Sequence, residues 1–272
     1  MNREDYEDPR CPLSGPVGNE DNFKPIPVRR VLAKLDEYEL ADDLEGARRH
    51  LLYWLEEAEL GGDLRGQLTL NNELIGHYRM SGDGEASLRH GEKALALLEK
   101  LGAEDTVTAG TTCVNVGTAR AAFGDPEGGY ALFERARANY EKNLPEGDPR
   151  LGGLYNNMGL CLTALARYTE ARELFSLALD IMKHKEHGEL EQAITWLNLA
   201  DAVSAELPPE AAEQEIEPYL DRAEALLDTP DLPRNSYYAF VCDKCAPVFG
   251  HYGRFLEERE LRKRVTEIRE GT

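Results

Sequence analysis

A pair of helical patterns that recurs at a fixed spacing constrains this chain more than any other feature. Residues 144–183 hold one such pair, in which a short turn at residues 166–169 separates two apolar stripes. Apolar side chains at steps of three and four residues lie on one face of a helix. The first stripe comprises Leu151, Leu154, Tyr155, Met158, Leu162 and Leu165. The second comprises Ala171, Leu174, Phe175, Ala178, Leu179 and Met182. The segment therefore predicts two helices that pack against each other.

The small and bulky positions of this pair return when the sequence is shifted back by 42 residues, and again after a second shift. The central pair has Tyr155, Met158, Gly159, Leu162, Ala171, Phe175 and Ala178. The two earlier pairs have Val116, Gly117, Gly129, Phe133 and Ala136, and then Leu74, Ile75, Ser87 and Ala94. A fixed period over several units indicates a helical repeat, because one unit alone cannot bury its apolar face.

This motif resembles the tetratricopeptide repeat. Its period of 42 residues exceeds the usual length of about 34. Together with the Leu-x-x-x-Asp-Pro connector at residues 144–149, this period resembles the repeat type of kinesin light chains. The resemblance covers roughly residues 28–268 and is closest over residues 106–183. It implies an all-α fold, an α–α superhelix that forms a right-handed solenoid of about five to six TPR-like helix pairs.

Stripes, turns and prolines delimit the expected helices around the central pair. Residues 1–26 lack apolar periodicity and predict a disordered or extended tail, followed by a repeat domain over residues 27–272. We expect an irregularity at Pro218 and a polar C-terminal capping helix, as the end of a solenoid requires. The other expected pairs are residues 27–40 with 44–60, 64–80 with 85–101, 106–123 with 126–144, 189–206 with 210–227, and 235–252 with 254–270.

Composition narrows the class of partner. The formal net charge is −20, and residues 186–231 carry thirteen Asp and Glu against a single Arg. Such a chain repels nucleic acid and anionic membranes and attracts basic partners, although solubility alone is an alternative role for the charge. No apolar run approaches the length of a membrane span, and the first residues show no apolar core of a secretion signal. We therefore expect a cytoplasmic protein.

The resemblance implies that the first helix of each pair lines a concave face that holds an extended peptide. One such position, two residues before the motif glycine, carries Glu73, Asn115, Asn157, Asn198 and Lys244. An Asn amide both donates and accepts, so a ladder of Asn side chains can pair with a peptide backbone of any sequence. The alternative is that these side chains form structural hydrogen bonds between neighbouring helices.

Other candidates on this face follow from the same offsets. They are Asn72, Asn156, Arg79, Thr111, Thr118, Leu160, Thr163, Asp201 and Asp243. The family's clamp for peptide carboxyl termini is not predicted, because Arg79 and Lys244 lie repeats apart. Because Glu73, Asp201 and Asp243 share the face, we expect a basic or neutral peptide rather than an acidic one.

Cysteine chemistry offers a different function. Cys242 and Cys245 form a C-x-x-C sequence with His251 six residues further on. A structural zinc site needs four ligands, usually from two such pairs, so we predict no metal and no cofactor. Cysteines three residues apart on a helix share one face, and there they pack into a core. A metal or redox role for this pair stays open as an alternative.

These observations predict a non-catalytic protein- or peptide-binding scaffold or adaptor. Phosphate loops, nucleophile elbows and metalloprotease motifs are missing from the sequence, so no enzyme is predicted. Two alternatives use the same repeats: a peptide-responsive regulatory sensor that acts through a partner, and a protein that assembles with itself.

Overall fold

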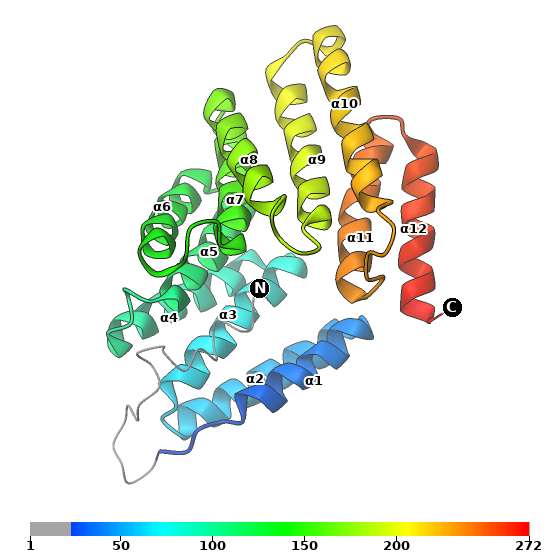
Figure 1. The fold of residues 1–272 in the computed structure, drawn as a ribbon. Coiled ribbons are helices and arrows are strands. Elements are labelled where there is room, and N and C mark those ends of the chain that lie inside the picture. The colour runs from blue at the N-terminus through cyan, green and yellow to red at the C-terminus, as the bar shows by residue number, and fades with distance from the viewer. Residues whose placement is uncertain (1–22, 272) are drawn as a thin grey trace. The chain divides into compact units, whose positions relative to one another are not determined.

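The computed structural model of the chain describes residues 23–271, and these residues form twelve helices and no strand (Figure 1). The predicted all-α fold is confirmed. The helices are α1 (Val28–Leu40), α2 (Leu44–Leu60), α3 (Leu64–Met80), α4 (Gly84–Leu101), α5 (Val107–Ala122), α6 (Pro126–Asn143), α7 (Pro149–Ala164), α8 (Tyr168–Met182), α9 (Glu189–Glu206), α10 (Pro209–Leu227), α11 (Ser236–His251) and α12 (Phe255–Glu270).

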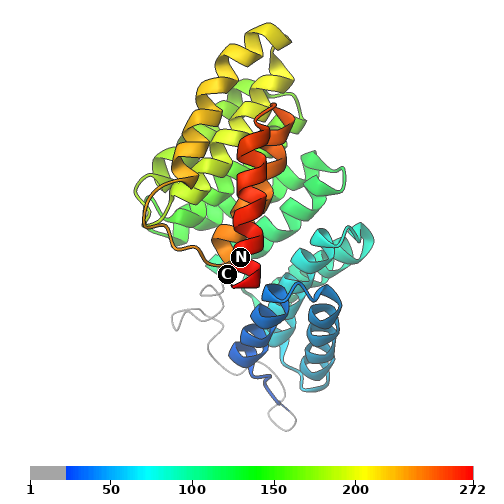
Figure 2. The same cartoon turned by 90° about the vertical axis from the view of Figure 1, so that its right-hand side faces the viewer.

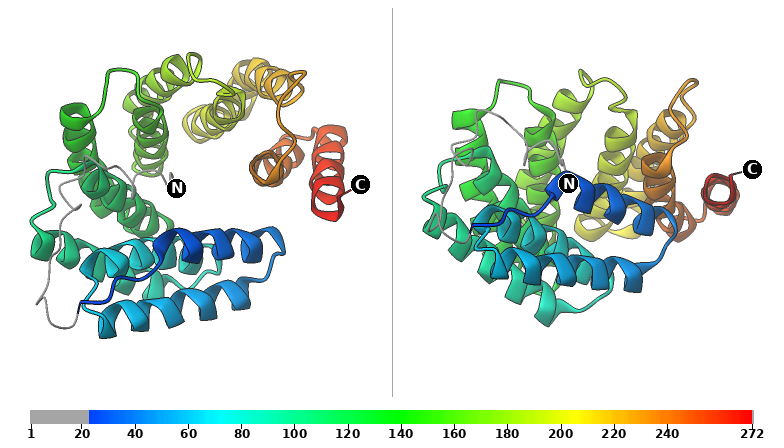
Figure 3. Two further views of the ribbon diagram at one scale, coloured as in Figure 1. Left: turned by 60° about the horizontal axis from the view of Figure 1, so that its bottom comes forward. Right: turned by 90° about the horizontal axis from the view of Figure 1, so that it is seen from below.

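The chain divides into two compact units, Met1–Pro145 and Glu146–Thr272. Unit one holds the helix pairs α1–α2, α3–α4 and α5–α6, and unit two holds α7–α8, α9–α10 and α11–α12. In unit one, the first helices α3 and α5 contact each other. In unit two, α9 contacts both α7 and α11, which Figure 3 shows on either side of it. The α11–α12 pair faces the viewer in Figure 2.

Most of the predicted tail, residues 1–26, lies outside the described residues. Its last residues contact the turn between α2 and α3. The Lys24 N–H donates to the Gly61 carbonyl at 2.9 Å, and the Ile26 N–H donates to the Asp63 carboxylate at 3.0 Å. The Ile26 side chain is buried. The packed part of the chain therefore begins a few residues before α1.

Three short turns between consecutive helices of unit one share the same sequence, Gly followed by Asp. Gly62, Gly82 and Gly124 adopt left-handed φ angles of 66°, 78° and 91°, which suit glycine at the end of a helix. The residue that follows each glycine is Asp, whose carboxylate accepts a hydrogen bond from the first turn of the next helix. These caps are Asp63 to Gly66, Asp83 to Ala86 and Asp125 to Gly128, at 2.9–3.0 Å. Each Gly-Asp pair thus ends one helix and begins another.

Prolines inside helices do not end them. Pro218 lies within α10 and Pro247 lies within α11, and both helices continue through these positions. The irregularity expected at Pro218 therefore does not divide the helix. Among residues 23–271, none of the helices is at once long and apolar enough to cross a lipid bilayer.

Each motif glycine receives an aromatic ring from the second helix of its pair. A Cβ atom on Gly117 would lie 2.7 Å from the Phe133 ring, and one on Gly159 would lie 2.6 Å from the Phe175 ring. Both rings are at most 1% exposed. The glycine therefore allows a close approach that any larger residue would block.

Gly159→Ala should destabilise the protein by about 1–3 kcal/mol, because the added methyl group overlaps the Phe175 ring. Gly153 lies on the same helix with no atom within 4 Å of an added Cβ, so Gly153→Ala should stabilise by about 0.5–1 kcal/mol through helix propensity. Chemical denaturation followed by circular dichroism measures both changes. Shifts of the same sign in the two variants would contradict the packing role of Gly159.

A buried histidine links α3 to α4 in unit one. His90 is 5% exposed, its Nδ1 donates to Asn71 Oδ1 at 2.8 Å, and its ring stacks on Tyr78 with centroids 5.5 Å apart. Burial, together with the nearby Lys93 and Arg89, lowers the pKa of His90 to about 4. The folded state therefore prefers the neutral imidazole.

This preference makes folding stability dependent on pH. As the pH falls below the ordinary histidine pKa of about 6.5, His90 of the unfolded chain binds a proton. In the folded chain His90 stays neutral until about pH 4. The contribution of neutral His90 to the free energy of unfolding is fully present above about pH 6.5. It decreases as the pH falls to about 4, by at most about 3 kcal/mol in total. His90→Gln should flatten this part of the wild-type curve in urea denaturation at a series of pH values. An unchanged slope would show that another group titrates.

Candidate binding surface on the first helices of the repeats

Hydrogen-bonded amides connect the first helices of neighbouring pairs. In unit one, Asn72 of α3 accepts from the Asn115 amide of α5 at 2.8 Å through its Oδ1. The Asn72 amide in turn donates to Thr112 Oγ1 and to the Leu68 carbonyl, each at 3.0 Å. Asn72 and Thr112 are fully buried. These residues therefore fix the register of α5 against α3.

A similar set of residues occurs in unit two, where the hydrogen bond between the Asn and the Thr has the opposite direction. Asn156 of α7 accepts from the Asn198 amide of α9 at 2.9 Å and from the Thr195 hydroxyl at 3.1 Å. We call each set of one acceptor Asn, one Thr and one donor Asn a brace. The threonines were not among the predicted residues, although each precedes a ladder position by one helical turn and so lies on the same face. That spacing is the signal that could have revealed them.

The predicted Asn ladder is thus not uniform. Asn115 and Asn198 each donate to an Asn of the preceding pair, as the structural alternative expects. Asn157 differs, because within residues 23–271 its half-buried side chain makes no hydrogen bond. It is the ladder amide with the greatest capacity to bind a ligand.

Most of the remaining candidates of unit one are buried or hydrogen-bonded inside the protein. Glu73 is 7% exposed, and burial lowers the pKa of Arg79. The Thr118 hydroxyl donates to the Val114 carbonyl at 2.8 Å, and the Thr111 hydroxyl lies 2.9 Å from the Tyr140 hydroxyl. Glu73 is therefore covered, and both threonine hydroxyls are hydrogen-bonded within the unit.

The candidates of unit two are more accessible. Leu160 of α7 is 41% exposed, whereas the neighbouring Thr163 hydroxyl donates to the Gly159 carbonyl at 2.9 Å. Asp201 accepts from the Tyr252 hydroxyl at 2.8 Å, and burial raises the pKa of this carboxyl group despite that bond. The Asp243 carboxylate lies 3.5 Å from Arg269.

Two exposed aromatic residues on α11 extend this surface. Tyr237 and Phe240 are each 43% exposed, and their rings stack with centroids 6.2 Å apart. The Lys244 ammonium lies 4.7 Å from the Phe240 ring centroid, and the Tyr237 hydroxyl donates to Glu191 of α9 at 3.1 Å. The sequence pattern had indicated only an apolar start of this helix. Steps of three and four residues from Tyr237 through Phe240 to Lys244 show that they share a face.

The C-x-x-C sequence lies in the core of unit two. Cys242 and Cys245 are at most 1% exposed among apolar residues from α9 to α12. Burial raises the pKa of Cys242 to about 11 and that of Cys245 to about 12. His251 is exposed and packs edge-on against Tyr252. Within the described part of the chain, no three His, Cys, Asp or Glu side chains come together as metal ligands. Protonated, buried thiols fit a packing role.

No protein-family model matches the sequence, and no curated protein matches it. Solved structures do resemble the fold. BtubC (BKLC) from P. vanneervenii matches with a TM-score of 0.63 and 19% identity, over 77% of this chain and 84% of that chain. Nearly identical kinesin light chain TPR-like repeats from Podosopora anserina match with a TM-score of 0.51 and 19% identity, over 74% and 94% of the two chains. The chain therefore has the fold of a tetratricopeptide-type helical repeat protein, as its sequence motif indicated.

Two adjacent asparagines on α7, Asn156 and Asn157, allow the structural role of the brace to be tested separately from ligand binding. Asn156→Ala removes the acceptor of both Thr195 and Asn198, and we expect it to destabilise the protein by about 1–3 kcal/mol. Asn157→Ala on the same helix should change stability by less than about 0.5 kcal/mol. Chemical denaturation of both variants tests the difference, and equal losses would mean that Asn157 also braces the fold.

Proposed function

We propose that the chain is a non-catalytic scaffold that binds an extended peptide segment of a partner protein on the first helices of unit two, α7, α9 and α11. The observation that carries this proposal is the exposure of Leu160, Tyr237 and Phe240 on these helices. In a repeat fold that buries most of its large apolar side chains, exposed aromatic residues beside polar groups are typical of a binding surface.

The neighbouring side chains supply the other contacts that a peptide needs. The Asn157 amide can pair with a peptide N–H and C=O, and Leu160 and Phe240 can receive its apolar side chains. In this proposal the Asn115 and Asn198 amides, with Asn72 and Asn156, hold the helices in register. The candidates Glu73, Arg79 and Thr118 of unit one are not needed for the contact.

Charge supports a basic or neutral peptide over an acidic one. Asp201 and Asp243 are exposed on α9 and α11, with Lys244 and Arg269 as the neighbouring cations. Residues 186–231, which include α9 and α10, carry a large excess of carboxylates. Such a field attracts cationic segments and repels nucleic acid and anionic lipid surfaces.

A reducing compartment fits the cysteines. Cys113, Cys161, Cys242 and Cys245 are buried and unbridged. Free buried thiols are usual in reducing compartments, which supports the cytoplasm as the location in this proposal.

Peptides selected from a random dodecamer library on the immobilised full chain provide a test. A selected peptide, labelled with a fluorophore, is titrated with wild-type and variant protein by anisotropy. Phe240→Ala should weaken binding at least about tenfold, because it removes an aromatic anchor. Asn157→Ala should weaken it about three- to tenfold through the lost backbone hydrogen bonds.

The control variant is Leu177→Ala, which changes an exposed apolar residue on the second helix α8 and should leave the affinity unchanged. Circular dichroism should show equal helicity in all variants. Selected peptides that bind wild type and both site variants with one affinity would refute the proposed surface.

A further inference from the structure

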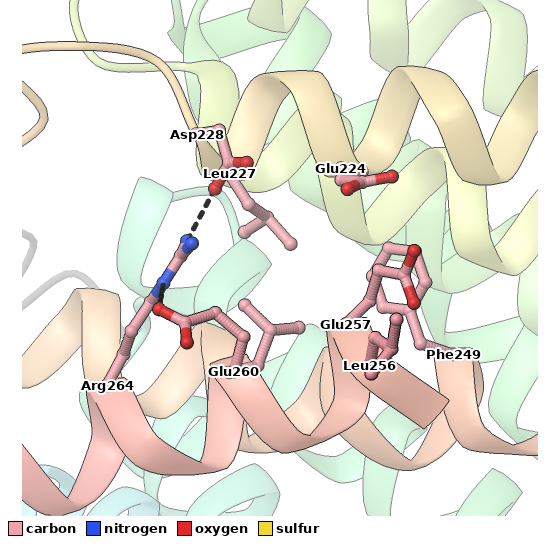
Figure 4. Close-up of a pocket in the computed structure, with 9 residues that line it drawn as sticks. Glu224, Leu227, Asp228, Phe249, Leu256, Glu257, Glu260 and Arg264 are labelled. Atoms are coloured by element: carbon pink, nitrogen blue, oxygen red, sulfur yellow. Dashed lines mark hydrogen bonds and ion pairs between the residues drawn. The ribbon is translucent and has the colours of Figure 1, made fainter. Parts of the chain in front are cut away.

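A pocket lies between α10 and α12 in unit two, away from the surface proposed above. Figure 4 shows it between the two helices, with Phe249 of α11 at one end. The cavity has a volume of about 190 Å³. No residue of this pocket belongs to the proposed peptide surface, so the two sites can be altered separately.

The pocket has an apolar floor and an exposed apolar edge. Leu227, Phe249 and Leu261 form the floor and are at most 4% exposed. Leu256 lines the edge and is 69% exposed, and its neighbour Phe255 is 68% exposed. Two consecutive large apolar side chains are therefore exposed at the start of α12.

At one end of the pocket, the cation and the carboxylates are already paired with each other. The Arg264 guanidinium lies 2.6 Å from Asp228 and 3.3 Å from Glu260, and it donates to the Tyr238 hydroxyl at 3.0 Å. Figure 4 shows the Arg264 and Asp228 side chains meeting across the gap between the helices. A ligand gains little there, because one cation already faces two carboxylates and a hydroxyl.

At the other end of the pocket, the carboxylates outnumber the cations. Glu224 of α10 and Glu257 of α12 each lie 3.6 Å from one nitrogen of Arg254, beyond hydrogen-bonding distance. The other terminal nitrogen of Arg254 lies 2.6 Å from both Glu217 and Asp221. A single guanidinium thus serves four carboxylates. Burial, followed by the repulsion from Glu257, raises the pKa of Glu224.

We infer that this pocket is a docking site for a protein segment that presents an arginine or lysine beside an apolar side chain. The cationic head would lie between Glu224 and Glu257, and its aliphatic stem would lie over Leu227 and Leu261. The adjacent apolar side chain would cover Leu256. Charge complementarity selects this occupant, because the carboxylates outnumber the cations at the pocket and the floor excludes a fully hydrated ion.

A pair of short peptides tests this chemistry directly. The probes are acetyl-Gly-Leu-Arg-Leu-Gly-amide and its citrulline counterpart, which has nearly the same shape and no charge. Each is titrated into the full chain with labelled leucine methyl groups observed by NMR. We expect the arginine peptide to shift the methyl signals of Leu227, Leu256 and Leu261, with at least tenfold weaker binding of the citrulline peptide.

Variants of the protein test which residues bind the arginine peptide. The double change Glu224→Gln with Glu257→Gln should abolish the preference for arginine, and Leu256→Ser should weaken both peptides. Phe240→Ala, on the other surface, should leave the titration unchanged. Equal binding of the arginine and citrulline peptides to wild type, or shifts confined to Leu160, would overturn the inference.

The melting temperature of the Glu224→Gln, Glu257→Gln variant provides a second test, because we expect it to rise while the affinity for the arginine peptide falls. Because Glu224 and Glu257 repel each other in the free protein, the double change should raise the melting temperature by about 1–3 °C while it weakens arginine binding. A purely structural pair of ion contacts with Arg254 predicts a lower melting temperature instead. A drop together with unchanged peptide binding would therefore contradict the docking site.

Two other occupants are outcomes of the same experiments. If the Leu256 signals shift as the protein concentration rises, and sedimentation shows a dimer that Leu256→Ser removes, the occupant is a second copy of the chain. If spermidine shifts the same signals as strongly as the arginine peptide, the site takes a small polycation. Either result would overturn the inference of a partner segment.

Discussion

The close contact between a glycine on one helix and a phenylalanine on the next is the interaction on which this fold depends. Gly117 with Phe133 and Gly159 with Phe175 bring paired helices together at distances that no larger residue allows. A single pair made in this way still has apolar surface on its outer side. Further helix pairs that stack against it cover that surface. The chain therefore repeats one structural unit instead of forming a single central hydrophobic core.

Contacts between pairs need more than apolar packing, because apolar surfaces have little directional preference. The two braces supply direction: Asn72 with Thr112 and Asn115, and Asn156 with Thr195 and Asn198. Buried amides that leave a partner unsatisfied are destabilising, so a shift in register by one residue is unfavourable. The α9 and α11 helices are connected differently, through tyrosine hydroxyls to carboxylates at Glu191 and Asp201.

The helices were predictable from sequence because each signal is local. Apolar steps, Gly-Asp turns and prolines act within one or two turns, and the observed bounds lie within about two residues of those expected. The site was less predictable because it depends on partners about forty residues away. Sequence offsets placed Asn115, Asn157 and Asn198 at one position, yet only the neighbouring helix decides that two of them brace the fold. The pocket at Glu224 and Glu257 likewise joins residues that lie 33 positions apart in the sequence.

The positions of the two braces define a second, longer period in the sequence. Each brace acceptor lies three residues before the motif position of its helix, and in α5 and α9 that place is taken by Val114 and Leu197. The brace therefore returns after four helices rather than two, at a spacing of 84 residues from Asn72 to Asn156. The smallest unit that repeats this hydrogen-bonding pattern along the sequence is therefore a block of two hairpins rather than one.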